Sequence, residues 1–179
     1  MRVKPGVMHI YYLSGTNGTL PAGLQMIGGN KEAQSPGENP HVSWSCGQTT
    51  SVSTPHMDMP YDCGPWAQYP FVDGIVALID FPSCRNGIGL RPEDVTYPEG
   101  GACPPGFGNA IPKLSERVHY GVMNPLGLDG TLAFQLSSGP AYSMHADFWN
   151  TWEQERLDQL VEDCLIAMVH CGSVDATSS

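Results

Sequence analysis

The sequence has little positive charge. Its 179 residues include 8 Lys and Arg against 18 Asp and Glu, which gives a formal net charge of −10 at pH 7. Binding to a phosphate backbone needs clustered positive side chains, so this balance argues against a nucleic-acid partner. No stretch approaches the roughly 20 apolar residues of a membrane span, and the first residues contain no apolar run of signal-peptide length. We therefore expect a soluble chain with no membrane insertion and no visible signal peptide.

Several enzyme signatures are also missing. The chain has no P-loop, no Gly-x-Ser-x-Gly nucleophile elbow and no dinucleotide-binding fingerprint. These absences remove several enzyme classes without selecting another one. No cofactor is indicated.

Glycine and proline are abundant, with 21 and 16 residues, while charged residues make up only 15% of the chain. The hydrophobic content of 41% is high enough to make global disorder a poor explanation. This composition predicts a compact, strand-prone fold with long ordered loops. We expect one domain over residues 1–172, because the length suits a single core, followed by a flexible polar tail at residues 173–179.

The six cysteines form an even set without any CxxC spacing, which gives little support to a zinc site. Pairing Cys46 with Cys63 and Cys84 with Cys103 would close two loops rich in Gly, Pro and Ser. Each disulfide would stabilise the fold by about 3 kcal/mol. The last two lie two helical turns apart and can pair only if a helix ends between them. The alternative is six reduced thiols in a cytosol. The cysteines are Cys46, Cys63, Cys84, Cys103, Cys164 and Cys171.

Runs of β-branched and aromatic residues predict strands. Val7–Leu13 precedes a turn-rich segment, and residues 75–81 are apolar except for Asp80, as in a central strand. The remaining strand candidates are residues 24–27, Val42–Cys46, residues 116–122 and residues 131–136, and the last two are expected to form a hairpin across residues 124–127. Residues 47–70 and 82–112 follow neither period, so we expect loops there, with at most isolated bridges in the second segment.

One helix is predicted, at about residues 150–170, from apolar positions three and four apart. Asn150 or Thr151 would cap it and Gly172 would end it. The predicted apolar face consists of Trp149, Trp152, Leu157, Leu160, Val161, Cys164, Leu165 and Met168. The fold class is therefore mainly β: an antiparallel β-sandwich-like domain with long disulfide-pinned loops, closed by one C-terminal amphipathic helix that packs its tryptophans on a sheet.

Two His-x-Asp pairs are the most suggestive chemical features. In an extended backbone, residues i and i+2 point to the same side, so His56 with Asp58 and His145 with Asp147 could each present an imidazole and a carboxylate. Facing each other, the two pairs would suit a divalent metal. The alternative, which we favour, makes His145 a hydrogen-bonding residue at a strand-to-helix junction and His56 an exposed loop residue. Similarly, Asp80 is either a catalytic acid or base or, as we favour, an acceptor of backbone N–H bonds.

Aromatic residues offer a second kind of site. A platform for sugar rings could be assembled from them, although such residues are more often anchors of the core or of loops. The residues concerned are Trp44, Trp66, Trp149, Trp152, Tyr61, Tyr69 and Tyr97. As binding residues we select Tyr142, His145, Asp147 and Trp66.

The order of several segments resembles a family of secreted proteins from fungi and actinobacteria, known as a domain of unknown function. The segments are GLQMIGG at residues 23–29, VSWSC at 42–46, DFPSC at 80–84, GACP at 101–104 and LSSGPAYSMHADFWNTW at 136–152. The last resembles the family's HADFxNGW motif and the helix after it. The resemblance implies a fold and an extracellular setting, and it covers the C-terminal part of the family domain.

Compared with that family, this chain is depleted in histidine. The family's HMHDFFGN segment has no counterpart, its FPDCWDG is reduced to FPSCRNG at residues 81–87, and its HRSHM position reads EDVTY at 93–97. The histidine of its CP-x-x-HP motif is also absent after Cys103 and Pro104. Of any metal or catalytic centre that the family's histidines build, the chain keeps at most His145 and Asp147.

These observations favour a non-enzymatic, surface-exposed structural or binding module. Its most concrete form is a decoration or attachment protein of a virion, such as a bacteriophage capsid or tail, because a virion surface is another route to an oxidising exterior. The expected partners are other protein subunits of a surface assembly or a cell-surface polysaccharide. The alternative is a secreted carbohydrate-active or metal-dependent enzyme using His145 and Asp147.

Overall fold

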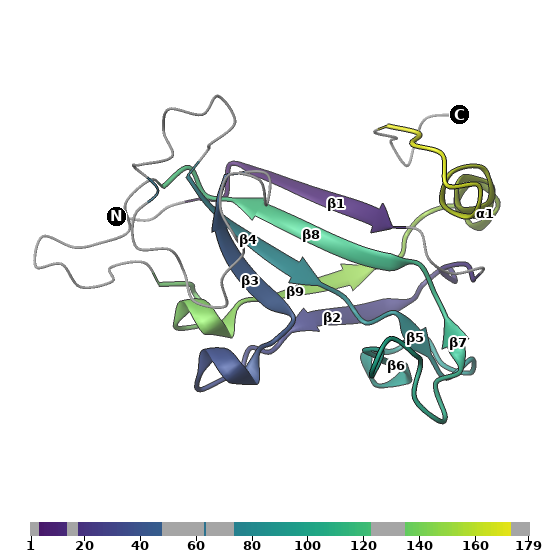
Figure 1. The fold of residues 1–179 in the computed structure, drawn as a ribbon, viewed down its shortest axis with the longest axis horizontal. Coiled ribbons are helices and arrows are strands. Elements are labelled where there is room, and N and C mark those ends of the chain that lie inside the picture. The colour runs from purple at the N-terminus through teal and green to yellow at the C-terminus, as the bar shows by residue number, and fades with distance from the viewer. Residues whose placement is uncertain (1–3, 14–17, 48–62, 64–73, 123–134, 173–179) are drawn as a thin grey trace, which may run out of the picture. The chain divides into compact units, whose positions relative to one another are not determined.

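The computed structural model describes residues 4–13, 18–47, 63, 74–122 and 135–172 (Figure 1). The described chain is mainly β, with antiparallel sheets, one C-terminal α-helix and three disulfides. The predicted fold class is therefore confirmed. The chain divides into two compact units: the first unit contains residues 1–10, 28–80 and 115–146, and the second contains residues 11–27, 81–114 and 147–179. The single domain over residues 1–172 and the flexible tail at residues 173–179 stay predictions.

The largest sheet has four strands in the order β1-β8-β4-β3 (Figure 1). The strands are β1 (Val7–Leu13), β8 (Lys113–His119), β4 (Ile75–Asp80) and β3 (Val42–Cys46). The antiparallel register places Trp44 opposite Ala77 and Ala77 opposite Val118. All three side chains are buried, so one face of this sheet forms the core of the first unit.

Most of the predicted strands are confirmed, with small shifts at their ends. β1 and β3 have the predicted bounds, β4 ends one residue early at Asp80, and β8 begins at Lys113 and ends at His119. The candidate at residues 24–27 corresponds to β2 (Gln25–Gly29). Residues 124–127 and 131–134 lie outside the described residues, as does nearly all of the loop expected at 47–70.

Strand β2 pairs with β9 (His145–Trp149) in a separate two-stranded sheet. Figure 1 shows the two strands side by side, with their arrows in opposite directions. β9 was not predicted as a strand, because its tryptophan was assigned to the helix that follows.

The segment expected to contain at most isolated bridges forms a small three-stranded sheet instead. Its strands are only two residues long: β5 (Cys84–Arg85), β6 (Val95–Thr96) and β7 (Asn109–Ala110), in the order β6-β5-β7. Three-residue 3-10 turns lie elsewhere along the described chain, at η1 (Pro36–Glu38), η3 (Pro92–Asp94) and η4 (Ala141–Ser143). Strands this short leave no hydrophobic period in the sequence, which is why the sheet was missed.

The C-terminal helix is shorter than predicted. α1 (Gln154–Leu160) continues as the π-helical turn η5 (Val161–Ile166), and the chain then reverses at Met168, whose φ is 56°. The predicted caps are therefore wrong: Glu153 occupies the N-cap position without a side-chain bond, and the helix ends well before Gly172. The described part of the chain contains no helix long and apolar enough to cross a membrane.

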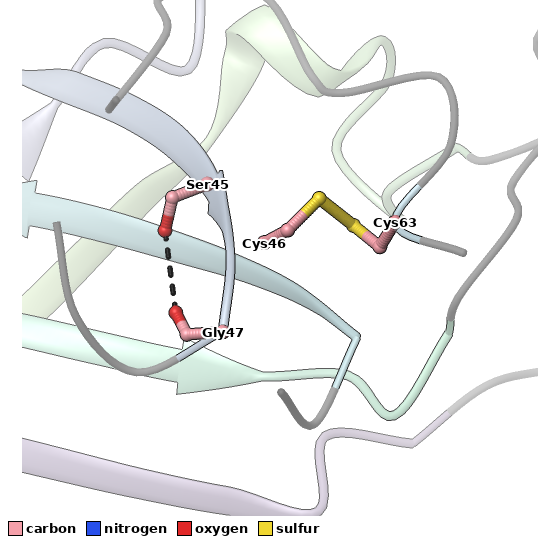
Figure 2. The surroundings of a disulfide bond; sticks show 4 residues. All are labelled: Ser45, Cys46, Gly47 and Cys63. Atoms are coloured by element: carbon pink, nitrogen blue, oxygen red, sulfur yellow. Dashed lines mark hydrogen bonds between the residues drawn. A yellow bond between two sulfur atoms is a disulfide. The ribbon is translucent and has the colours of Figure 1, made fainter. Parts of the chain in front are cut away.

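All six cysteines are paired in the predicted combinations. Cys46–Cys63, shown in Figure 2, joins the end of β3 to a buried cysteine. Cys84–Cys103 holds the small sheet, and Cys164–Cys171 closes the reversal after the helix with 5.8 Å between Cα atoms. The last pair satisfies the condition that the helix ends between its cysteines. Disulfides persist in oxidising compartments, so the complete pairing indicates an extracellular or otherwise oxidising environment.

Candidate functional site

Strand β9 sorts its side chains onto two faces. Phe148 is buried, and its ring contacts that of Phe81 with 6.0 Å between centroids. His145 is half-buried, whereas Asp147 and Trp149 are exposed. Because alternate side chains of a strand leave on the same side, these three residues share the outward face of β9.

The register of β2 against β9 is fixed at both ends. At one end, the backbone N–H of Asn150 donates to the carbonyl of Leu24 at 2.8 Å. At the other end, Gly29 (φ +83°) lies so close to the neighbouring backbone that an added Cβ would be 2.5 Å from the carbonyl oxygen of Met144 and 3.1 Å from the Cα of His145. A glycine is therefore needed at this position, both for its φ and for the close approach.

This register defines an outward surface within the second unit, which we call the Trp149 face. Gln25 lies opposite Trp149 and Ile27 lies opposite Asp147, and directly opposed side chains have Cβ atoms about 5 Å apart. The side chain of Trp149 is 64% exposed and that of Ile27 is 43% exposed. The Trp149 face thus combines a large exposed indole with an aliphatic side chain, a carboxylate and an amide.

The chain leading into β9 is held by a buried asparagine of the first unit. Asn39 is 3% exposed, and its Nδ2 donates to the carbonyls of Tyr142 at 2.9 Å and Met144 at 2.8 Å. Within the same turn, the hydroxyl of Ser143 donates to the carbonyl of Pro140 at 2.8 Å. These bonds fix the backbone just before the strand.

The chain leaving β9 is held by a second buried asparagine, in the second unit. Asn150 is 2% exposed, and its Nδ2 donates to the carbonyls of Leu20 at 3.0 Å and Pro21 at 2.8 Å. Its Oδ1 accepts the backbone N–H of Trp152 at 3.3 Å. Asn150 therefore joins two segments far apart in the sequence and is not the helix cap that the sequence predicted.

The predicted packing of Trp149 and Trp152 on one helix face is wrong. Trp149 belongs to β9, because the backbone remains extended as far as Asn150, whose N–H donates to the carbonyl of Leu24 just before β2. Trp152 lies before the helix and is half-buried, and its Nε1 donates to the hydroxyl of Tyr12 at 3.0 Å. Burial raises the pKa of Tyr12, and the hydrogen bond with Trp152 opposes this shift.

Fewer residues of the predicted apolar helix face are buried than expected. Only Leu157 and Val161 are buried among the helical members of that set, while Met168 is 81% exposed. The helical segment ends at Ile166, and the Cys164–Cys171 disulfide closes the reversal that follows it.

His145 makes the kind of local contact that its structural interpretation requires. Its Nδ1 lies 3.2 Å from the carbonyl oxygen of Ser143, two residues earlier. Asp147, in contrast, is exposed, and its side chain makes no hydrogen bond within the described part of the chain. The carboxylate of Asp147 is therefore available to a ligand.

The other predicted site residues fall in different places. Tyr142 is half-buried in η4, and its carbonyl is one of those held by Asn39. His56, Asp58 and Trp66, as well as Tyr61 and Tyr69, lie outside the described residues.

The paired metal site was suggested as an alternative and cannot be assembled from what is described. Two of its four proposed ligands, His56 and Asp58, lie outside the described residues. Within the described residues, no three His, Cys, Asp or Glu side chains are grouped so as to hold a metal ion.

Two further residues considered as site candidates belong to the first unit. Trp44 is fully buried, and its ring lies 5.9 Å from that of Tyr120, so it is a core residue. Asp80 is half-buried at the end of β4, where its backbone N–H donates to the carbonyl of His41 at 2.9 Å. The role of the Asp80 carboxylate stays a prediction.

The first unit also buries the carboxyl group of Glu116, which was not among the site residues predicted from the sequence. Glu116 is 5% exposed and lies opposite Ile79, which itself lies opposite Val42. Burial raises the pKa of Glu116. Burial and the nearby charge of Glu116 together raise the pKa of Tyr120 to about 12. The alternating pattern of β8 placed Glu116 on the apolar face, and that was the signal available in the sequence.

Asn39 and Asn150 are the positioning residues that sequence reasoning missed. Each follows or precedes a strand in a polar segment, where an asparagine is usually interpreted as a turn or cap residue. The backbone carbonyls that they bind lie more than a hundred residues away in the sequence, and a local sequence pattern does not indicate so distant a partner.

The model of the domain of unknown function DUF1996 matches residues 1–152, which include β9 and both buried asparagines. The chain belongs to the DUF1996 family. No curated protein and no solved structure matches it. The DUF1996 match agrees with the resemblance seen in the sequence and adds no reaction or ligand.

Proposed function

We propose that this DUF1996 protein is a non-enzymatic, surface-exposed module that contacts other protein subunits. Its most concrete form is a decoration or attachment protein of a virion. The single observation that carries the proposal is the exposed apolar strand β1.

β1 is an edge strand of the four-stranded sheet in the described chain. In the first unit, Val7, Met8 and Ile10 are 50%, 60% and 40% exposed. Val7–Leu13 contains no Lys, Arg, Asp, Glu or Pro, the residues that usually protect an exposed edge from other chains. Met8 and Ile10 leave one side of the strand and Val7 leaves the other, and an unprotected edge strand with exposed apolar side chains is typical of a protein–protein contact. We call Val7, Met8 and Ile10 the β1 patch.

The chemistry of the rest of the chain is consistent with an exterior location. Three disulfides tie down short strands and loops, and such crosslinks suit a protein that must survive outside a reducing cytosol. A net charge of −10 keeps such a module soluble until its apolar patch meets a partner.

Sedimentation velocity tests the proposal. We expect the wild-type chain to associate reversibly as its concentration rises, because the β1 patch is then the available partner surface. Ile10→Lys should abolish the association by placing a charge in the patch. Ile88→Lys is the matched control, since Ile88 is 88% exposed and lies outside the patch. Association that persists in Ile10→Lys would contradict the proposal.

The virion form of the proposal has its own test. Capsid or tail genes beside this gene, together with the protein in purified particles, would support it. A neighbourhood of polysaccharide-degrading enzymes would favour the alternative.

That alternative is a secreted carbohydrate-active or metal-dependent enzyme using His145 and Asp147. The observation in its favour is that both side chains occupy the outward face of β9. It predicts turnover that His145→Ala and Asp147→Asn both abolish, whereas the surface module predicts none.

A further inference from the structure

The Trp149 face differs in chemistry from the β1 patch. The β1 patch contains only apolar side chains, whereas the Trp149 face places one indole beside a carboxylate, an amide and an aliphatic side chain. Trp149 is 64% exposed, which is costly for so large an apolar side chain. Phe148, one position earlier, is buried, so the strand could place an aromatic residue in the core and nevertheless presents Trp149 outward.

The neighbours of Trp149 favour a ligand with both apolar and hydroxyl surfaces. An indole binds flat C–H surfaces by stacking, and its flanks here are the Asp147 carboxylate and the Gln25 amide. A carboxylate accepts hydrogen bonds from hydroxyls, and an amide both donates and accepts them. A sugar ring offers this combination, with C–H groups on one side and hydroxyls around its edge.

The backbone beneath the face is held rigidly, as a binding surface requires. The side chain of Asn150, next to Trp149, donates to two carbonyls of a distant segment, and its backbone N–H donates to the carbonyl of Leu24, just before β2. On the inner side, Phe148 packs against Phe81. A preorganised flat surface loses little conformational entropy when a ligand stacks on it.

Charge restricts the ligand further. Asp147 lies within the face, and the chain as a whole carries a net charge of −10. Both disfavour an anionic polymer such as a polyuronate or a sulfated glycan. We infer that the Trp149 face binds an uncharged polysaccharide, with Trp149 stacking on a sugar ring and Asp147 and Gln25 bonding its hydroxyls. This inference goes beyond the proposed subunit contact and uses a different surface.

Sedimentation with insoluble polysaccharides tests the inference. The probes are cellulose, chitin and insoluble β-1,3-glucan as uncharged polymers, and a heparin resin as the anionic one. We expect the full chain to bind at least one uncharged polymer and not heparin. Trp149→Ala should weaken that binding about tenfold or more, Trp149→Tyr should retain part of it, and Ile88→Ala should bind as wild type does.

Several outcomes would overturn the inference. These are a wild-type chain that binds none of the three uncharged polymers, a Trp149→Ala variant that binds as tightly as wild type, and reducing ends released by wild type but not by Asp147→Asn. Because Trp149 is exposed, its variants should keep the wild-type urea midpoint, which separates lost binding from lost folding. Association through the β1 patch is measured without polysaccharide, so the failure of either idea leaves the other standing.

Discussion

Two buried asparagines have more influence on the candidate site than the histidine and aspartate that first drew attention to it. Asn39 holds the turn before β9 and Asn150 holds the segment after it. Each uses one side-chain amide to satisfy two backbone carbonyls, which are costly to leave unpaired when buried. Asp147 makes no comparable contact in the described chain and is therefore open to a functional role.

The first prediction compares Asn150 with Asp147. Asn150→Ala removes both donors to Leu20 and Pro21 and should lower the free energy of unfolding by about 2 kcal/mol. Asp147→Asn changes an exposed side chain and should stay within about 0.5 kcal/mol of wild type. Urea titrations of the two variants measure both values. Equal stabilities would contradict this assignment of roles.

The second prediction concerns Glu116, whose pKa is raised by burial. At a pH between the pKa of Glu116 in the unfolded chain and its higher pKa in the folded chain, Glu116 is ionised in the unfolded chain and protonated in the folded one. Stability therefore falls as pH rises through that window. Glu116→Gln lacks this loss, so its stability relative to wild type should increase between pH 4 and pH 7.

Urea midpoints of wild type and Glu116→Gln at both pH values test this prediction. The same variant should also lower the pKa of Tyr120 from about 12, since the Glu116 charge contributes to that shift. The pKa of Tyr120 can be measured from the ultraviolet absorbance of the tyrosines as the pH is raised. A stability difference that is the same at pH 4 and pH 7 would show that Glu116 titrates as an exposed carboxyl does.

At the scale of elements, the sequence predicted the long strands well. Val7–Leu13 and Val42–Cys46 were found with their exact bounds, because their β-branched and aromatic residues are followed by turn residues. The two-residue strands around Cys84 were beyond prediction, since a period needs more residues than they contain. Their sheet is held by the Cys84–Cys103 disulfide.

The site was predicted less well than the fold, for a physical reason that Trp149 illustrates. Its spacing to Leu157 and Val161 fits a helical face, yet the pairing of β9 with β2 keeps it extended. A contact with a strand more than a hundred residues away overrode the local pattern. His145 and Asp147 were identified, but the Gln25 and Ile27 side chains that complete the surface come from β2 and could not be associated with them.

The third prediction ranks two disulfides by the chain that each one constrains. Replacing Cys164 and Cys171 by serine should cost about 2 kcal/mol, because their separation is only 7 residues. Replacing Cys84 and Cys103, which are 19 residues apart, should cost about 1 kcal/mol more. Chemical denaturation of the two double variants gives the order. The reverse order would mean that the C-terminal reversal supports more of the fold than its loop length implies.

At the scale of the whole molecule, the two compact units present different surfaces. The first unit exposes the apolar β1 patch, and the second exposes the Trp149 face. We propose a protein partner for the first surface and a polysaccharide for the second. All of this depends on a chain whose cysteines are oxidised where it works.

All six cysteines of this DUF1996 protein are paired, which indicates an extracellular or otherwise oxidising environment. The most direct test is the intact mass of the protein from its natural source, denatured and alkylated without reduction. We expect no alkyl groups before reduction and one on each of the six cysteines after it, since all six are paired. Alkylation of all six cysteines without reduction would show that the protein works with reduced thiols.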